Sequence, residues 1–272
     1  MACFWNRTTM APVLREAYRP EIAIQLYSLR ALGDPAKQLE AVRDCGFDAV
    51  ELLQPHLLDT AHTAHLLDRY GLTPVSAHVR LNLLTERLGD VICAAKHLQI
   101  KRLAIPNTPK ALRLRLVSLG GWPDFVRRLA GLATRLADLD LNLAYHNHGW
   151  ELRRWFGRER PLDQLLDPTI AGALGWQADL GWLERRGIRS ADAIRLHGDR
   201  MMSVHLKDVS PNGTTRAQGV WSDIGHGILP WQAIWRGLMT AKVPCLIIEH
   251  DRPSDPVKFM QRSRTTLLGL AT

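Results

Sequence analysis

Apolar residues follow two alternating patterns along the chain. Short continuous apolar runs, typical of strands covered on both faces of a sheet, alternate with longer stretches whose apolar residues repeat at helical spacing. The short runs predict eight strands, over residues 21–26, 47–53, 73–79, 101–105, 141–146, 173–179, 200–205 and 243–249. The periodic stretches predict helices over residues 35–45, 59–70, 84–98, 122–139, 161–166, 190–196, 230–239 and 255–268.

This order predicts one domain. Eight strand–helix repeats in 272 residues favour an α/β protein with a single (β/α)8 TIM barrel. A doubly wound open sheet is the structural alternative, but no glycine-rich phosphate-binding turn follows the first strand. Residues 1–20 have no clear period and are predicted to form a surface tail, so residues 21–272 make up the barrel domain. The longest irregular stretch within the barrel is the loop 209–227.

Four successive predicted strands end on side chains that can bind a divalent cation. These residues are His146, Asp179, His205 and Glu249. A lone histidine beside apolar residues is usually a core histidine, but here the pattern recurs. Because the carboxyl ends of barrel strands meet at one mouth, the recurrence predicts a metal site there. The register of the fifth strand leaves open whether His146 or His148 points inward.

Composition and charge exclude several other classes of protein. The formal net charge of +8 invites a nucleic-acid partner, but the arginines are scattered through helices without a compact basic run, so DNA binding should be weak and steeply salt-dependent. No apolar run reaches transmembrane length, and the first 20 residues lack the features of a signal peptide. The four cysteines form no CxxC pair, and we expect them to be reduced in a cytoplasmic protein.

Beyond these patterns, eight segments in order resemble a known superfamily. The chain looks like the sugar phosphate isomerase/epimerase superfamily, also called xylose isomerase-like TIM barrels. The resemblance runs from about residue 21 to the C-terminus and rests on IAIQLYSLR, CGFDAVELL, YGLTPVSAHV, YHNHGWEL, ADLGW, VHLKD, IGHGILPW and LIIEHD. The ordered set is specific for the superfamily but not for a substrate.

The resemblance implies a metal site with one departure. Members typically hold one divalent metal with a Glu on strand five, an Asp on six, a His on seven and a Glu on eight. The last three fall on Asp179, His205 and Glu249, while strand five offers His146 or His148. Imidazoles with carboxylates suit Mn²⁺ first, with Zn²⁺, Co²⁺, Fe²⁺ or Mg²⁺ as alternatives. A second departure is His226 in IGHG, where relatives often carry Glu.

Such a metal supports proton removal next to a carbonyl. It would stabilise the enediolate that forms when a carbon-bound proton leaves a keto-sugar. Glu249 is the first candidate base, and Glu151, His148 and His226 are candidates for the second proton transfer. Lys207 could hold a developing oxyanion, or it could be a structural lysine paired with Asp208 or Glu249.

Further residues near strand ends are candidates for substrate binding. Glu51 could contact the substrate or play a polar role inside the barrel, and His78 could contact the substrate or be a core histidine. Trp150 and Trp182 could stack on a sugar ring or simply fill the core. The candidate substrate contacts are Glu51, His78, Asn107, Trp150, Trp182 and His226.

The sequence therefore predicts a metal-dependent isomerase or epimerase that acts on a small sugar or keto-sugar. The partner is a small carbohydrate, with no nucleic acid or membrane, and the chain could form a homo-oligomer. The nearest rival is a lyase on the same scaffold, such as an inosose dehydratase or an enzyme that eliminates an aglycone from a keto-glycoside. The missing strand-five Glu favours this rival, because elimination does not need two symmetrical bases. A third alternative is an AP endonuclease, although the chain is short of ligands for its zinc cluster. The remaining alternative is a non-enzymatic protein that keeps the barrel fold and has lost catalytic activity.

Overall fold

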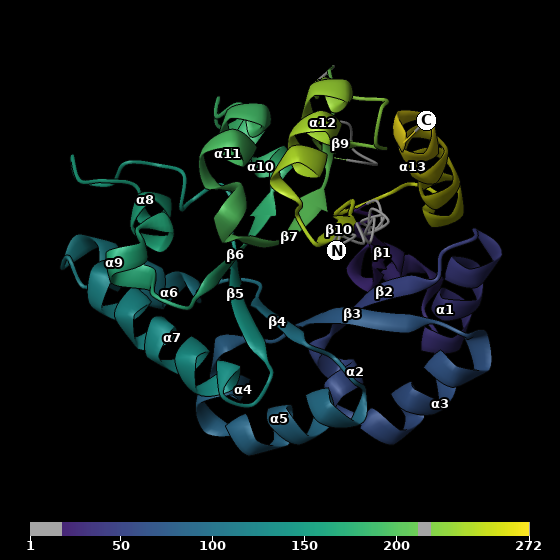
Figure 1. The fold of residues 1–272 in the computed structure, drawn as a ribbon, viewed down its shortest axis with the longest axis horizontal. Coiled ribbons are helices and arrows are strands. Elements are labelled where there is room, and N and C mark those ends of the chain that lie inside the picture. The colour runs from purple at the N-terminus through teal and green to yellow at the C-terminus, as the bar shows by residue number, and fades with distance from the viewer. Residues whose placement is uncertain (1–17, 212–218, 272) are drawn as a thin grey trace, which may run out of the picture.

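Eight parallel strands close into a barrel in the computed structural model, which describes residues 18–211 and 219–271. The helices surround the strands (Figure 1). Each neighbouring pair is parallel, and the first strand closes against the last with Ala23 opposite Ile247. In barrel order the strands are β1 (Glu21–Gln25), β2 (Ala49–Leu53), β3 (Thr73–His78), β4 (Arg102–Ile105), β5 (Asn142–His146), β6 (Gly175–Asp179), β7 (Met201–Leu206) and β10 (Cys245–Ile248). The prediction of an α/β TIM barrel is confirmed. The surface tail predicted for residues 1–20 lies, as far as residue 17, outside the described residues.

The longer helices of the outer layer follow the predicted pattern with two differences, and several short helices were not predicted. The predicted helix over residues 84–98 is two helices, because the backbone leaves the helical region at Arg87 (φ −137°). The helix Lys110–Ser118 was not predicted, since arginines interrupt its apolar spacing. The major helices are α1 (Pro35–Asp44), α3 (Thr60–Tyr70), α5 (Leu88–His97), α6 (Lys110–Ser118), α7 (Trp122–Ala137), α11 (Ser190–His197), α12 (Trp231–Ala241) and α13 (Pro256–Ala271). The shorter ones are η1 (Leu26–Leu32), α2 (Gln54–Leu58), α4 (Leu81–Glu86), α8 (Pro161–Leu166), α9 (Pro168–Ala171), α10 (Leu180–Arg185) and η2 (Gly198–Arg200).

Alternation along the strands separates two apolar clusters. One set of side chains, including Ile24 and Val50, belongs to the large core shared with the helices. The opposite set points into the barrel, where small residues form a second cluster of Ala23, Ala49, Val75, Cys245 and Ile247. Two residues further along the same strands the inward side chains become polar: Gln25 follows Ala23, and Glu51 follows Ala49. The site therefore begins where the apolar interior of the barrel ends.

A small antiparallel ribbon follows β7. Strand β8 (Asp208–Val209) pairs with β9 (Trp221–Ser222), which shortens the irregular loop predicted over residues 209–227, part of which lies outside the described residues. The buried carboxylate of Asp208 accepts bonds from the backbone N–H groups of Gly225, Gly227 and Leu229 at 3.0–3.2 Å. Asp208 therefore organises the ribbon, and it is not the partner of Lys207 that the sequence suggested.

No helix within the described residues is both long and apolar enough to cross a bilayer. Of the four cysteines, the three in the described part of the chain, Cys45, Cys93 and Cys245, are free thiols.

Candidate metal centre

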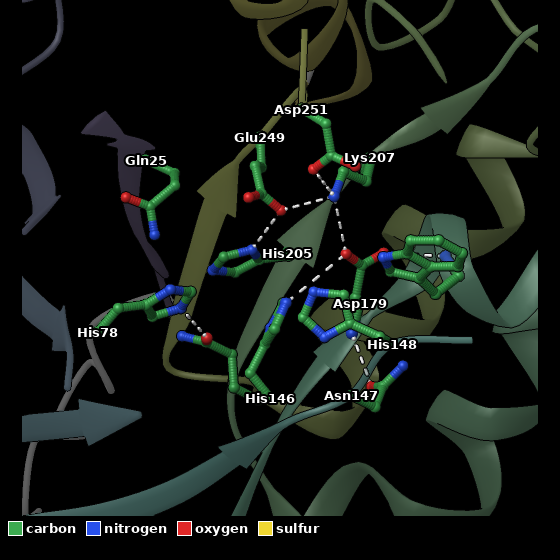
Figure 2. Close-up of polar contacts among 12 residues, drawn as sticks. Gln25, His78, His146, Asn147, His148, Asp179, His205, Lys207, Glu249 and Asp251 are labelled. Carbon is green, nitrogen blue, oxygen red and sulfur yellow. Dashed lines mark hydrogen bonds and ion pairs between the residues drawn. The ribbon is translucent and has the colours of Figure 1, made fainter. Parts of the chain in front are cut away.

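The four predicted ligands come together at the carboxyl end of the barrel. Their ligand atoms, from His146, Asp179, His205 and Glu249, all lie within 4.8 Å of one another, and the four residues are buried. Figure 2 shows the side chains converging from four neighbouring strand ends. His146 ends β5 and Asp179 ends β6, whereas Glu249 follows β10 directly. Adjacent parallel strands thus deliver two imidazoles and two carboxylates to one point.

His205 is held so that one ring nitrogen faces this cluster. Its Nε2 lies 2.7 Å from Glu51 Oε2, deeper in the barrel, while its Nδ1 lies 2.8 Å from Glu249 Oε2. Burial favours the neutral ring, but Glu249 and Glu51 raise the pKa of His205 to about 10. A histidine that gives its far N–H to a carboxylate is the arrangement that orients metal-ligating histidines. Metal binding at Nδ1 would replace the proton now shared with Glu249.

His146 has the opposite character. Burial, together with the neighbouring imidazoles, holds its pKa well below the usual value, so the ring is neutral. Its Nε2 lies 3.9 Å from Asp179 Oδ2, and its buried Nδ1 has no hydrogen-bond partner. A neutral imidazole supplies the lone pair that a cation needs. Nitrogen and oxygen donors together suit a transition metal such as Mn²⁺ or Zn²⁺ better than Ca²⁺.

Lys207 joins three carboxylates around the cluster. Its buried Nζ lies 2.9 Å from Glu249 Oε2, 3.1 Å from Asp179 Oδ2 and 2.7 Å from Asp251 Oδ1. Figure 2 shows the ammonium between these groups. Burial opposes its charge, but the carboxylates raise the pKa of Lys207 well above the usual value. The lysine therefore stays charged and fixes the orientation of two candidate ligands.

The charges of the centre leave room for a divalent cation. Glu51 accepts bonds from Ser76 Oγ at 2.6 Å and Gln177 Nε2 at 2.7 Å, and burial of this carboxylate is offset by His78 and His205, which lower its pKa. Four carboxylates are balanced by only two cationic groups, Lys207 and the protonated ring of His205, so the centre carries a formal excess of negative charge. Uncompensated buried charge is costly, and a divalent cation would offset it. The residues present fit a metal ion.

His148 lies beside the cluster but not in it. Its ring centre is 4.9 Å from that of His146, nearly perpendicular to it, and its buried Nδ1 has no partner. Burial and then Lys207 lower the pKa of His148 to about 4, so this ring is also neutral. Between the two histidines, Asn147 Oδ1 accepts a bond from the backbone N–H of Asp179 at 3.0 Å. The sequence left open whether His146 or His148 points inward, and the structure brings His146 to the four-residue cluster.

A cavity of about 510 Å³ opens above the cluster. It is lined by His146 and Glu249 of the cluster and also by His78, His148 and Asn107. The volume falls within the usual range of ligand pockets, about 300–1,000 Å³. His78 lines the cavity, and its Nε2 also lies 2.7 Å from Gln177 Oε1 in the barrel interior. It is therefore both a candidate substrate contact and a hydrogen-bonded interior histidine. Glu51 is fully buried in the layer beneath and does not line it.

The remaining candidates lie in different places. Trp150 and Trp182 line a smaller cavity that adjoins the first. Glu151 is buried elsewhere: its carboxylate accepts bonds from Tyr145 Oη at 2.9 Å and from the backbone N–H of His148 at 2.8 Å. His226 is exposed in the turn after β9. The structure does not bring Glu151 or His226 to the lining of either cavity.

Several polar residues of the site were not predicted. Asp251 binds Lys207. Its place two residues after Glu249 could have indicated this, because side chains two residues apart in an extended segment point to the same side. Gln25 and Gln177 both donate to Glu51 from inside apolar strands, where an isolated amide has no other reason to be. Asn147 lies between two histidines that were singled out. None of these residues belongs to the cluster of four candidate ligands. Each contacts a candidate ligand or a residue that orients one.

Comparison with known families and structures identifies relatives of the chain and of its fold. Residues 39–266 match the family described as Xylose isomerase-like TIM barrel. No curated protein matches the sequence. The chain is similar in fold to a sugar phosphate isomerase/epimerase from Parabacteroides distasonis, with a TM-score of 0.70, 14% identity, and coverage of 93% of this chain and 95% of that one.

Two further solved structures are similar at comparable levels. One is a probable 3-DHS dehydratase from Bacillus anthracis, involved in petrobactin synthesis, with a TM-score of 0.66, 12% identity, and coverage of 91% and 98% of the two chains. The other is the IOLI protein, solved with a binding zinc atom, with a TM-score of 0.64, 13% identity, and coverage of 92% and 97%. At such identities the likeness shows the fold alone.

Proposed function

The chain belongs to the xylose isomerase-like TIM barrel family, and from this we propose that it is a divalent-metal-dependent isomerase or epimerase of a small sugar or keto-sugar. The observation that carries the proposal is the buried cluster of His146, Asp179, His205 and Glu249 beneath an open cavity. A cation held by these residues would polarise the substrate carbonyl and stabilise the negative charge that develops when a neighbouring proton leaves.

We assign proton removal to Glu249. Burial works against its charge, but Lys207 and His205 hold the pKa of Glu249 well below its usual value, so it is ionised at neutral pH. It lines the cavity and can reach a substrate there. Lys207 keeps the carboxylate oriented through the 2.9 Å contact to Oε2. With its ammonium bound to three carboxylates, we assign Lys207 a positioning role rather than direct contact with the substrate.

The second proton transfer falls to His148. Inversion at a carbon needs one group on each face, and His148 lines the cavity with an Nδ1 that has no partner. Because the ring is neutral, it would take up a proton from solvent and then donate it to the carbon. Glu151, which the sequence offered for this role, has both oxygens bonded inside the protein. We therefore propose that Glu151 supports the loop that carries His148, and that His226 takes no part in the reaction.

Deuterium exchange tests this division of roles. The metal-loaded enzyme is incubated in D₂O with a panel of ketoses, inososes and 3-keto-glycosides, and deuterium uptake and products are followed by NMR. Glu249→Gln should abolish exchange and turnover together. His148→Gln should retain exchange while product formation falls by about 10²-fold or more, because only the first half-reaction survives. A variant that loses neither would contradict the assignment.

A lyase or dehydratase is the second candidate function. The observation that favours it is the strand-five position, where His146 stands in the cluster and no carboxylate of the loop after β5 reaches the cavity. Elimination needs one base and one acid on the leaving group, so Glu249 and a proton donor suffice. A similar structure is a probable 3-DHS dehydratase. Release of water or an aglycone in the same NMR experiment, without an epimeric product, would establish this alternative.

A further inference from the structure

A second, smaller cavity adjoins the one above the candidate metal centre. It has a volume of about 300 Å³ and shares Asn107 and His148 with the larger cavity, so one ligand can extend from one to the other. Its remaining lining comes from Arg113 on α6, from Gly149 and Trp150 after β5, and from Trp182 and Arg186 on and after α10. No acidic residue is part of the described lining.

Both arginines of this side cavity lack a carboxylate partner. Among the ion pairs of the described residues, neither Arg113 nor Arg186 takes part. Arg186 donates only its Nε, to the backbone oxygen of Gly149 at 3.0 Å, which leaves the terminal nitrogens of its guanidinium free. Arg113 lies over the ring of Trp150, with its guanidinium carbon 5.3 Å from the ring centre. Two guanidinium groups thus face one cavity, and neither has a carboxylate of the described residues within ion-pair distance.

The residues that line the side cavity carry a large share of the unpaired buried nitrogens. Eight buried side-chain nitrogen or oxygen atoms of the described residues have no hydrogen-bond partner, and four of them belong to residues lining the side cavity. They are Arg113 Nε, His148 Nδ1, Trp150 Nε1 and Trp182 Nε1. Trp150 is itself only 8% exposed. Buried polar groups in native proteins are normally paired, and here the described residues supply no partner.

The backbone is shaped to keep these groups together. A Cβ at Gly149 would lie 2.9 Å from a ring carbon of Trp182 and 3.1 Å from Arg186 Nε, closer than side chains normally approach. Glycine at this position therefore lets the indole and the guanidinium pack against the loop. Arg113 acts on the charge of Glu151, but this carboxylate is already bonded to Tyr145 and to the backbone of His148, and it forms no ion pair with Arg113. The side cavity therefore places two guanidinium groups beside several unpaired side-chain nitrogens.

We propose that the side cavity binds an oxyanion group, a carboxylate or a phosphate, carried by the substrate whose carbonyl end lies at the metal centre. Guanidinium groups bind both anions through paired, charge-assisted hydrogen bonds. The substrate class is therefore an acidic sugar, either a sugar acid or a sugar phosphate, rather than a neutral ketose. The link to the carbonyl end depends on the proposed function, whereas binding of an anion to the side cavity does not.

Calorimetric titration of the full-length protein tests the inference with three probes: inorganic phosphate, D-gluconate and the neutral polyol sorbitol. We expect at least one anion to bind in a salt-dependent manner and sorbitol not to bind. Arg113→Gln and Arg186→Gln should each raise the Kd of that anion by about tenfold or more. Whichever anion binds more tightly identifies the group as phosphate or carboxylate. Circular dichroism of each variant checks the fold, and Arg186→Gln suffices if Arg113→Gln does not fold.

Two controls separate this inference from the proposed function. Arg236→Gln removes the same charge from an exposed arginine whose Nε likewise bonds only a backbone oxygen, that of Gln232, and it should leave anion binding unchanged. His205→Ala removes a candidate metal ligand and should also leave anion binding unchanged. The inference is overturned if neither anion binds, if sorbitol binds as tightly as gluconate, or if Arg236→Gln weakens binding as much as the side-cavity variants do. Loss of binding in His205→Ala alone would place the anion at the metal centre and overturn it as well.

Discussion

Lys207 holds the carboxylates of the centre together. Its ammonium is the only lysine or arginine charge in ion pairs with Asp179, Glu249 or Asp251 in the described part of the chain. Removing one partner of a buried ion pair leaves uncompensated charge, which costs far more than the net value of the pair. The carboxylates then depend on a bound cation for compensation.

Lys207→Met should accordingly lose about 3 kcal/mol or more of stability when no metal is present. Added Mn²⁺ should restore a larger part of that loss than it adds to the wild type, because the cation replaces the missing charge. Thermal unfolding with and without Mn²⁺ measures both effects. An equal metal-induced shift in the two proteins would show that the lysine and the cation do not share these carboxylates.

Glu151 gives stability a pH dependence. Burial raises its pKa from 4.5 to about 7. The folded state therefore favours the protonated carboxyl, and this contribution is fully present below about pH 4.5 and is lost as the pH rises through 7. Glu151→Gln stays neutral throughout. Between pH 5 and 8 the wild type should lose about 2 kcal/mol of stability relative to this variant. Urea unfolding across that range provides the measurement, and parallel pH profiles would be incompatible with the raised pKa.

At the scale of single elements, the ribbon β8–β9 depends on close approach at Gly227. A Cβ there would lie 2.1 Å from Asp208 Oδ1 and 2.3 Å from the backbone oxygen of Val209. Gly227→Ala should therefore displace the carboxylate that organises the ribbon, and we expect a loss of about 1–3 kcal/mol, the usual cost of overpacking.

Gly131→Ala is the matched control for this substitution. Gly131 is an exposed residue within α7, and a Cβ there meets no atom within 4 Å. Alanine is a better helix former than glycine, so this change should stabilise the protein by up to about 1 kcal/mol. Denaturant midpoints of the two variants provide the comparison. A midpoint for Gly227→Ala as high as that of Gly131→Ala would contradict the prediction, because the ribbon would then accommodate the added methyl group without cost.

The strands and their ends could be predicted from the sequence, because the apolar runs of the strands alternate with helical spacing and several of these runs end on a polar residue that can bind a metal. Apolar runs such as 243–249 report burial on both faces, and a polar residue that ends such a run lies at the barrel mouth. Contacts between distant strands have no such local signal. That His205 lies between Glu51 and Glu249, or that Lys207 binds Asp251, depends on the register of the closed sheet. The side cavity is also beyond reach, since Arg113 and Arg186 are separated by the whole of β5 and β6.

For the whole molecule, the fold accounts for where the candidate site lies. The barrel interior is apolar below and polar above, and the four candidate ligands end neighbouring strands at the polar end. The adjoining side cavity carries two arginines without acidic partners. Two arginines thus lie beside the substrate cavity, where we expect them to attract an acidic substrate.

The metal content of the purified protein tests the central claim most directly. After incubation with Mn²⁺ and removal of excess metal, elemental analysis of the wild type should give one divalent ion per chain. His205→Ala should give none while its circular dichroism stays unchanged. His62→Ala, which removes an exposed histidine of α3, should retain the full content. A wild type without stoichiometric metal, or a His205→Ala variant that binds as much as the His62→Ala control, would contradict the assignment of this cluster as a metal centre.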